Sequence, residues 1–190
     1  MGKEAKQIAF FKISNHSELL IIIAIFSKLN LNTTKHLDFL AFAQGFMLYS
    51  KSNDTEYRKN LKPTLCSIIN TLNSKRTNFD MSSAHKIELS ANWILGFVEG
   101  DGSFSYDSSS SANRFSIKQK DINKAILIAI RDYFNNLARK SDYSLDINEN
   151  VVNVYNEMPN FSRLNISRTS FIGDVLIPFF NSLTFQTKKI

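Results

Sequence analysis

The stretch WILGFVEGDGSFSY, residues 93–106, is the most informative part of the sequence for predicting the fold. Its apolar residues predict a helix, yet Gly96 and Gly100 fall inside that helix, where a glycine costs about 1 kcal/mol relative to alanine. Glu99 and Asp101 lie at its polar end, and from Gly102 onward polar and apolar residues alternate, which predicts a strand. The glycines must therefore serve a purpose that outweighs their cost.

The composition is that of a basic protein with enough apolar residues for a core. The 190 residues are 43% hydrophobic, which suits one domain or two small ones. A net charge of +6 favours a nucleic acid or another anionic partner, although many proteins of other classes are mildly basic. The single cysteine, Cys66, excludes an internal disulfide and a cysteine-based zinc site. The apolar run at residues 19–26 is far shorter than the ~20 residues of a membrane span, so no membrane partner is expected.

The chain divides into three blocks. Residues 1–50 predict a short strand at 9–14, a helix from about Ser17 to Leu29, and a second helix capped by one of residues 32–34. Residues 51–88 predict a basic linker with one helix that begins at Pro63, because proline suits a first helical turn. Residues 89–190 predict an α+β unit in the order helix, two strands, helix, two strands, helix, with Asp121 capping the middle helix.

Two segments of the chain resemble each other, which indicates an internal repeat. Residues 25–36 align without a gap to residues 179–190, and four positions are identical. The identical pairs are Phe26 and Phe180, Leu29 and Leu183, Thr33 and Thr187, and Lys35 and Lys189. We therefore expect residues 1–50 to be the C-terminal part of a first repeat and residues 89–190 to be a second repeat.

The spacing of two glycines indicates a helix interface. Gly96 and Gly100 are four residues apart, so they share one helix face, and small residues at this spacing let two helix backbones approach closely. Such an approach would bring Asp101 close to an acid on the partner helix. Two adjacent carboxylates repel each other, and a hard divalent cation relieves the repulsion. Glu99 lies about 200° around the helix from Asp101, so it need not share this site.

The segment ILGFVEGDG, residues 94–102, resembles the LAGLIDADG motif of homing endonucleases and intron maturases. The segments NSKRTNF before it and LIPFFNSL after it are similar to those of organellar, fungal-type intron-encoded members. The resemblance implies the α+β LAGLIDADG fold, with a curved antiparallel sheet packed on helices. It also implies Mg²⁺-dependent hydrolysis of phosphodiester bonds in double-stranded DNA.

The resemblance implies roles for particular residues. Asp101 would be the metal-binding catalytic acid, and Gly100 would offer its backbone carbonyl to the metal. Gln119 would line the catalytic pocket at the end of the second strand. Lys189, and Lys35 from the other repeat, would be the basic residues near the scissile phosphate.

One face of the predicted sheet would bind nucleic acid. Along the strands, polar side chains alternate with apolar ones that would pack on helices, and the polar set would face the major groove, where side chains read base edges. The alternative is an ordinary solvated sheet face. The polar set is Ser103, Ser105, Asp107, Arg114, Ser116, Lys118, Lys120, Arg163 and Asn165.

The sequence contains one such motif, whereas two-repeat members of the family carry two. Three outcomes stay open: a homodimer through the motif helix, a complex with a complementing LAGLIDADG fragment, or a remnant that binds without cutting. The enzyme hypothesis is a homing endonuclease. The alternative is an intron maturase or inactive remnant that binds structured RNA, for example within an organellar ribosome. An abundance of Asn, Ile, Phe, Lys and Ser suits AT-rich codons, which predicts an organelle-encoded, mitochondrial protein.

Overall fold

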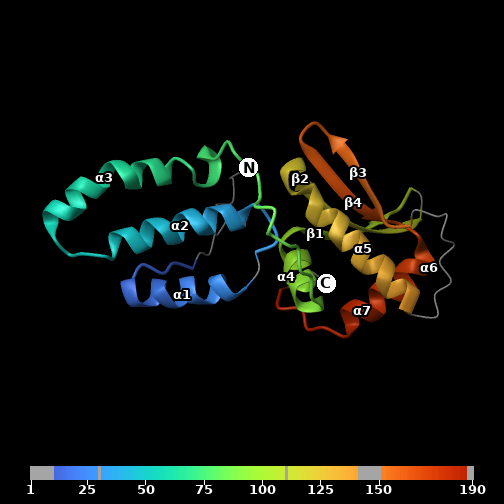
Figure 1. Ribbon diagram of the computed structural model, residues 1–190. Coiled ribbons are helices and arrows are strands. Elements are labelled where there is room, and N and C mark those ends of the chain that lie inside the picture. The colour runs from blue at the N-terminus through green and yellow to red at the C-terminus, as the bar shows by residue number, and fades with distance from the viewer. Residues whose placement is uncertain (1–10, 30, 110, 141–150, 188–190) are drawn as a thin grey trace, which may run out of the picture.

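The computed structural model describes residues 11–29, 31–109, 111–140 and 151–187. A four-stranded antiparallel sheet in the order β1-β2-β4-β3 dominates the C-terminal half (Figure 1). It is built from α4 (Ala91–Asp101), β1 (Gly102–Asp107), β2 (Ala112–Lys120), α5 (Lys124–Lys140), β3 (Asn153–Met158) and β4 (Phe161–Ile166). A final helical run comprises α6 (Thr169–Phe171), a π-helical segment at Ile172–Leu176, and α7 (Ile177–Asn181). This order confirms the predicted α+β fold class.

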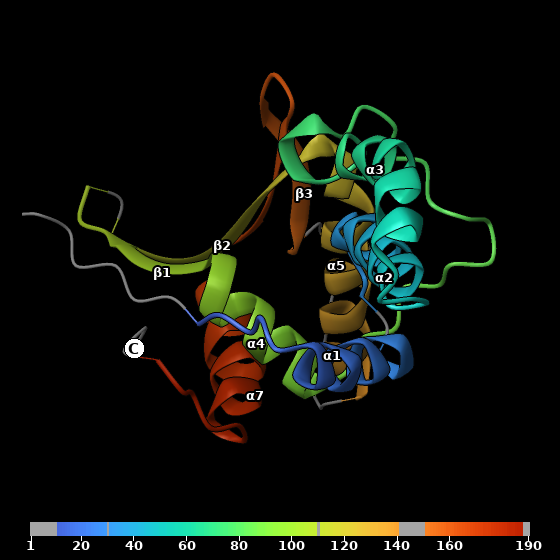
Figure 2. The same cartoon turned by 90° about the vertical axis from the view of Figure 1, so that its left-hand side faces the viewer.

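The core lies between one face of the sheet and the helices. Figure 2 shows the sheet as a curved layer with α4, α5 and α7 on one side and no described helix on the other. Phe115 from β2 and Phe134 from α5 contact Phe179 and Phe180 of α7 through tilted and edge-to-face rings. Each fully buried large apolar side chain contributes about 1.5–3 kcal/mol. Among the described residues, the apolar ones with no exposed surface are Ile94, Val98, Ile117, Leu127, Ile130, Phe134, Ala138, Leu164, Ile166 and Phe171.

Local sequence signals determine where α4 begins and ends. Ser90 caps it, since its side-chain oxygen accepts a hydrogen bond from the Trp93 backbone N–H at 3.1 Å. The helix ends at Gly102, where an added Cβ would lie 2.7 Å from Cγ1 of Val98 and 2.8 Å from its carbonyl oxygen. Glycine is therefore needed at residue 102 because the backbone passes so close to the preceding turn.

The start of α5 differs from the prediction. Asp121 does not cap this helix; it begins a 3-10 turn, Asp121–Asn123, and α5 follows from Lys124. Its carboxylate accepts a hydrogen bond from the Ser162 hydroxyl, and its backbone N–H donates to the Asn160 carbonyl at 2.9 Å. Asp121 therefore ties β2 to the β3–β4 hairpin, a long-range bond that local capping rules cannot anticipate.

The final helical run is not a regular α-helix. Residues 169–181 form one helical run whose central segment is π-helical. Pro178 lacks a backbone N–H and its ring crowds the preceding turn, so a wider π turn directly before it relieves that crowding. The run still buries Val175, Leu176, Phe179 and Phe180 against the sheet.

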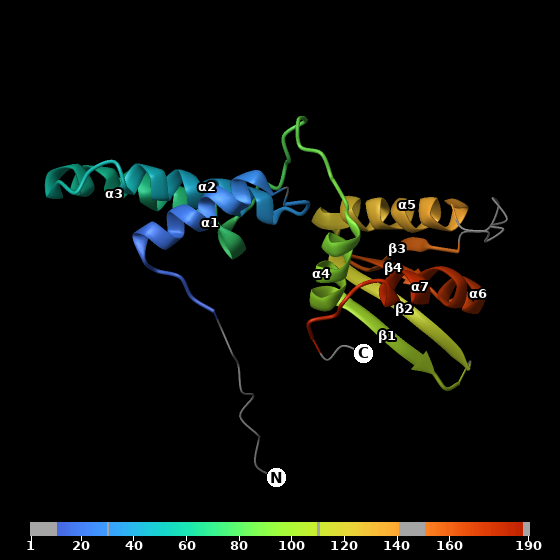
Figure 3. The same cartoon turned by 90° about the horizontal axis from the view of Figure 1, so that it is seen from below.

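Three helices form a second lobe beside the sheet: α1 (His16–Lys28), α2 (Lys35–Tyr49) and α3 (Thr55–Ile69) (Figures 1 and 3). The strand predicted at 9–14 was wrong over its described part, because residues 11–15 form no strand. Asn15 caps α1 instead, its side chain accepting from the Ser17 N–H at 2.9 Å. The prediction that a helix begins at Pro63 was also wrong: Asp54 caps α3, and Pro63 lies inside it.

The connection between the lobes is held by specific hydrogen bonds. The Asn32 side chain donates to the Glu88 carbonyl at 2.7 Å and accepts from the Glu88 N–H at 2.9 Å. Thr34 is the N-cap residue of α2, yet its side chain makes no capping bond. Instead its backbone N–H donates to Oδ1 of Asn123 on the sheet lobe at 3.0 Å.

The domain boundaries predicted at 50/51 and 88/89 remain a prediction. In the described part of the chain no helix has the length and apolarity to cross a membrane.

Candidate acid site and nucleic-acid interface

Asp101 and Gln119 lie side by side, although they come from different elements. Asp101 is the last residue of α4 and is exposed, while Gln119 is near the end of β2. The Gln119 side-chain amide donates a hydrogen bond of 2.6 Å to Oδ2 of Asp101. The two residues expected to share a catalytic pocket are thus in direct contact, with the carboxylate held in one orientation and open to solvent.

A third residue, not anticipated from the sequence, continues this contact. The Asn123 side-chain amide approaches Oε1 of Gln119 at 3.4 Å, and its own Oδ1 accepts from the Thr34 N–H at 3.0 Å. Asn123 therefore connects the Asp101–Gln119 pair to the first turn of α2. The available signal was its position four residues after Gln119, in a polar segment directly following a strand.

Lys35 follows Thr34 but has its own partners. Its amine lies 3.1 Å from Oδ2 of Asp38 and 3.0 Å from Oδ1 of Asn73, and its side chain is 68% exposed. Asp38 also pairs with Arg76 at 3.0 Å. Partial burial raises the pKa of Asp38, but hydrogen bonds from the Asn73 backbone, Lys35 and Arg76 outweigh it and hold that pKa below its usual range. Lys189, the other predicted basic residue, lies outside the described residues.

Glu99 has a different task from Asp101. Its Oε1 accepts hydrogen bonds from the backbone N–H groups of Gln186, at 2.6 Å, and Thr187, at 2.7 Å. The carboxylate thus fastens the segment after α7 to α4. This agrees with the helical geometry that separated Glu99 from Asp101.

The glycine face of α4 is open. Gly96 and Gly100 are exposed, and a Cβ added at either would meet no atom within 4 Å among the described residues. This contrasts with Gly102, which packs tightly within its own chain. No described residue of this chain lies where a side chain at residue 96 or 100 would point, and an interface with another helix remains the prediction for both.

The nine predicted binding residues share one face of the sheet. The register places Ser103 opposite Ser116, and Ser116 opposite Asn165. It also places Ser105 opposite Arg114 and Lys118 opposite Arg163. Because side chains alternate along a strand, Asp107 and Lys120 fall on the same face. This is the face that carries no described helix in Figure 2.

Acids partner the basic residues of this face. Asp107 lies 3.7 Å from Arg114. Glu157, which the sequence reading missed, pairs with both Lys118, at 2.9 Å, and Arg163. The Lys118 hydrogen bond is the main cause that holds the pKa of Glu157 below its usual value, and Arg163 adds to it. The sequence signal for Glu157 was its spacing: residues 153, 155 and 157 are two apart along β3, so their side chains are expected on one face of the sheet.

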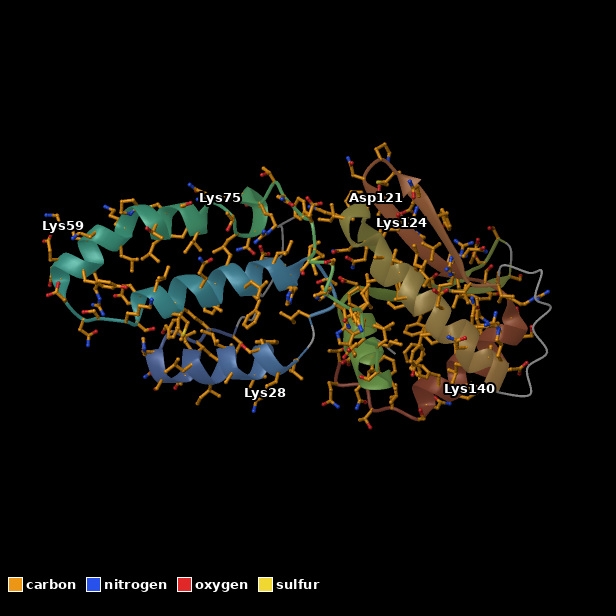
Figure 4. All side chains as sticks on the ribbon, viewed as in Figure 1. Lys28, Lys59, Lys75, Asp121, Lys124 and Lys140 are labelled. Atoms are coloured by element: carbon orange, nitrogen blue, oxygen red, sulfur yellow. The ribbon has the colours of Figure 1, made fainter. Side chains whose placement is uncertain are left out.

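Other basic side chains project from the second lobe. Figure 4 shows Lys28, Lys59 and Lys75 pointing outward from the helices, while Asp121 and Lys124 lie at one end of the sheet lobe. The Lys124 amine donates to Oδ1 of Asn156 at 2.6 Å. Positive charge is thus present on both lobes, but the aligned polar residues lie on the sheet.

The described part of the chain offers few side chains that could together hold a metal ion. Among the described residues, no group of three or more His, Cys, Asp and Glu side chains could hold a metal ion. Asp101 offers one exposed carboxylate at a helix end, beside the Gly100 carbonyl. One carboxylate with a backbone carbonyl and retained waters suits Mg²⁺, which keeps several waters and needs one or two carboxylates.

Comparison with known proteins identifies the family of this chain. Residues 94–190, more than half of the chain, match the family model described as LAGLIDADG endonuclease. The chain belongs to the LAGLIDADG endonuclease family. Over 96 residues it is 26% identical to a Schizosaccharomyces pombe protein named probable intron-encoded endonuclease Cox1-I1b, a match that covers 50% of this chain and 23% of the relative.

Solved LAGLIDADG structures share the fold of both lobes. The meganuclease I-CpaMI bound to uncleaved DNA is 25% identical with a TM-score of 0.72, covering 93% of this chain and 63% of that one. The meganuclease I-SmaMI bound to uncleaveable DNA is 20% identical with a TM-score of 0.75, covering 93% and 62%. The chain thus spans about a quarter of the curated relative and about three fifths of these structures.

Proposed function

We propose that this chain is one part of a LAGLIDADG homing endonuclease, binding double-stranded DNA on its sheet face and supplying Asp101 to a paired-acid, Mg²⁺-dependent site. The observation that carries the proposal is the exposed Asp101 carboxylate, held by Gln119 at the end of a helix whose glycine face is open. Two acids that face each other across an interface can hold the divalent metal ions that assist attack of water on a phosphodiester.

DNA as the partner is supported by the sheet and by the relatives. The nine aligned polar residues lie on a curved, uncovered face, and curvature of this kind suits the major groove, where base edges are read. The I-SmaMI and I-CpaMI structures are both described as bound to DNA.

A complementing LAGLIDADG unit is the partner that the helical lobe favours. None of the residues of α1 is buried, and Ile21 and Leu29 are 60% and 56% exposed. The residues aligned with Phe26 and Leu29 in the repeat, Phe180 and Leu183, pack against the core beneath the second sheet. The apolar face of α1 therefore fits a sheet from a first repeat, which either an upstream segment or a separate chain could supply.

Five residues would have roles in the proposed hydrolysis. Asp101 and the Gly100 carbonyl would hold Mg²⁺ together with the acid of the partner unit. When bound, Mg²⁺ stabilises charge on the attacking and leaving oxygens of the phosphodiester. Gln119 orients the Asp101 carboxylate, and Lys35 and Lys189 would place positive charge near the scissile phosphate.

The test begins with the protein isolated from its source. Native mass spectrometry of that preparation identifies the partner chain, and the same preparation is then assayed for nicking of plasmids that carry fragments of the source genome. With Mg²⁺ present, the wild-type assembly should nick a subset of plasmids, and an Asp101→Asn assembly should bind them without nicking. Asp132→Asn, an exposed acid on α5, is the matched control and should nick normally.

Two results would contradict the proposal. Unchanged nicking by the Asp101→Asn assembly would remove Asp101 from the mechanism. Retention of structured RNA, together with no cleavage of any plasmid, would favour the alternative, an RNA-binding maturase or an inactive remnant within a ribonucleoprotein.

We also infer an organellar, mitochondrial origin. The AT-rich amino-acid usage and the similarity to an intron-encoded endonuclease support it. Cell fractionation with an antibody to the chain tests it, and recovery outside the mitochondrial fraction would contradict it.

A further inference from the structure

On the binding face of the sheet, two basic residues share one acid. Lys118 and Arg163 lie directly opposite each other on β2 and β4, where like charges repel. Glu157 resolves the repulsion: its Oε2 lies 2.9 Å from the Lys118 amine, and its Oε1 pairs with Nη2 of Arg163. The three residues, here called the Glu157 clamp, carry a net charge of +1 rather than +2.

The clamp fixes the directions of both basic side chains. Arg163 Nη1 donates to the Ser116 hydroxyl at 3.3 Å, and the Lys118 amine lies 4.9 Å above the Phe161 ring. Oε2 of Glu157 and Nε of Arg163 have almost no exposed surface. Oε2 of the carboxylate is thus covered, while the Glu157 side chain as a whole is 25% exposed, against 35% for Lys118 and 26% for Arg163.

The donors that remain are suited to bases more than to phosphates. Each terminal nitrogen of arginine carries two hydrogens, so Nη1 and Nη2 each keep one donor beyond the contacts to Ser116 and Glu157. The Lys118 ammonium has three hydrogens, and its contacts with Glu157 at 2.9 Å and the Met158 sulfur at 3.6 Å leave one donor. Guanine presents two acceptors, O6 and N7, in the major groove, and arginine or lysine is their commonest partner. With one of their two charges offset, these oriented donors gain less from a phosphate than a free Lys–Arg pair would, but they match this acceptor pair.

We propose that Glu157 is a positioning residue for sequence recognition, which holds Lys118 and Arg163 so that they read a guanine instead of binding phosphates without selectivity. This inference rests on the proposed function, because it assumes that the sheet face enters a major groove. It adds a residue that determines specificity by orienting two others.

The test compares Glu157→Gln with Glu56→Gln, which removes the same charge from an exposed position on α3 of the other lobe. The full chain is used to select binders from a library of randomised DNA duplexes, and the affinity for an unselected duplex is measured across salt concentrations. Glu157→Gln should lose one guanine preference that the wild type shows. It should also bind the unselected duplex more tightly, with a salt slope steeper by about 1. Glu56→Gln should match the wild type.

A second variant separates charge from geometry. Arg163→Lys keeps the charge but loses the planar fork, so it should keep the wild-type salt slope and lose the same guanine preference. If Glu157→Gln and Arg163→Lys select the same sequences as the wild type, the inference is overturned while duplex binding, and with it the proposed function, stands. If the wild-type chain binds no duplex even at low salt, both fail together.

Discussion

Gln119 donates a 2.6 Å hydrogen bond to the carboxylate of Asp101, 18 positions earlier in the sequence. The amide is the end of a chain of contacts that runs through Asn123 to the backbone of Thr34. The orientation of the acid therefore depends on a strand, a 3-10 turn and a helix of the other lobe. It depends on more of the molecule than the motif helix alone.

Gln119→Ala should lower the nicking rate of the assembled protein about 10–100-fold and leave DNA affinity unchanged. Removing a group that orients a metal-binding acid typically has an effect of this size. Single-turnover nicking and fluorescence anisotropy measure the two quantities. A loss of affinity equal to the loss of rate would mean that Gln119 binds DNA and does not orient Asp101.

Gly96→Ala and Gly102→Ala should act in opposite directions on the stability of the chain. An alanine at residue 96 meets no atom within 4 Å and improves helix propensity, so it should stabilise the isolated chain by up to about 1 kcal/mol. An alanine at residue 102 would lie 2.7 Å from Val98 and should destabilise it by about 1–3 kcal/mol. Urea unfolding measures both effects.

The same Gly96→Ala variant tests the interface. If a partner helix packs on the glycine face, the added methyl group separates the two backbones, and association should weaken while the chain itself becomes more stable. Sedimentation velocity with the partner measures this. Unchanged association would place the interface elsewhere.

Ile21→Ser should leave the stability of the isolated chain within about 0.5 kcal/mol of the wild type, because the side chain is largely exposed. It should nevertheless weaken association with a complementing repeat that covers α1. Glu18→Gln, on the same helix, is the control for a change at a polar position. Equal association of Ile21→Ser and the wild type would show that the apolar face of α1 stays uncovered in the assembly.

Stability should decline in acid partly through Asp38. The folded-state pKa of Asp38 lies below its ordinary value of 3.8, so its ion pairs with Lys35 and Arg76 stabilise the fold fully above that value. This contribution is lost as the pH falls from about 3.8 through the lower folded-state pKa. Asp38→Asn should therefore unfold more easily than the wild type at pH 6, with a smaller difference at pH 3. Urea unfolding across this range is the measurement, and a constant difference would contradict the assignment.

The sequence allowed prediction where a local rule acts alone. Alternation along β1 and β2 was enough to place Ser103, Arg114 and Lys118 on one face, because the side-chain period of a strand is fixed. The motif helix was likewise predicted from its apolar residues, and the structure adds Ser90 as its cap.

Prediction failed where a distant segment competes with the local rule. Asp121 is a good capping residue, but its carboxylate accepts a hydrogen bond from the Ser162 hydroxyl on β4. The Pro63 prediction failed for a local reason: Asp54, nine residues earlier, caps α3, and the helix continues past the proline. Glu157 and Asn123 went unnoticed because their partners lie in other elements, and such pairings are visible only once the strands are in register.

The contact between Thr34 and Asn123 has a consequence for building chimeric nucleases. A graft that takes residues 89–190 alone would carry the sheet, Asp101 and Gln119, but Oδ1 of Asn123 would then accept from water in place of the Thr34 backbone N–H. It would also discard both Asn32 and Glu88, whose hydrogen bonds join the helical lobe to the start of the sheet lobe. A donor segment that begins before Asn32 would transfer the acid together with the contacts that orient it.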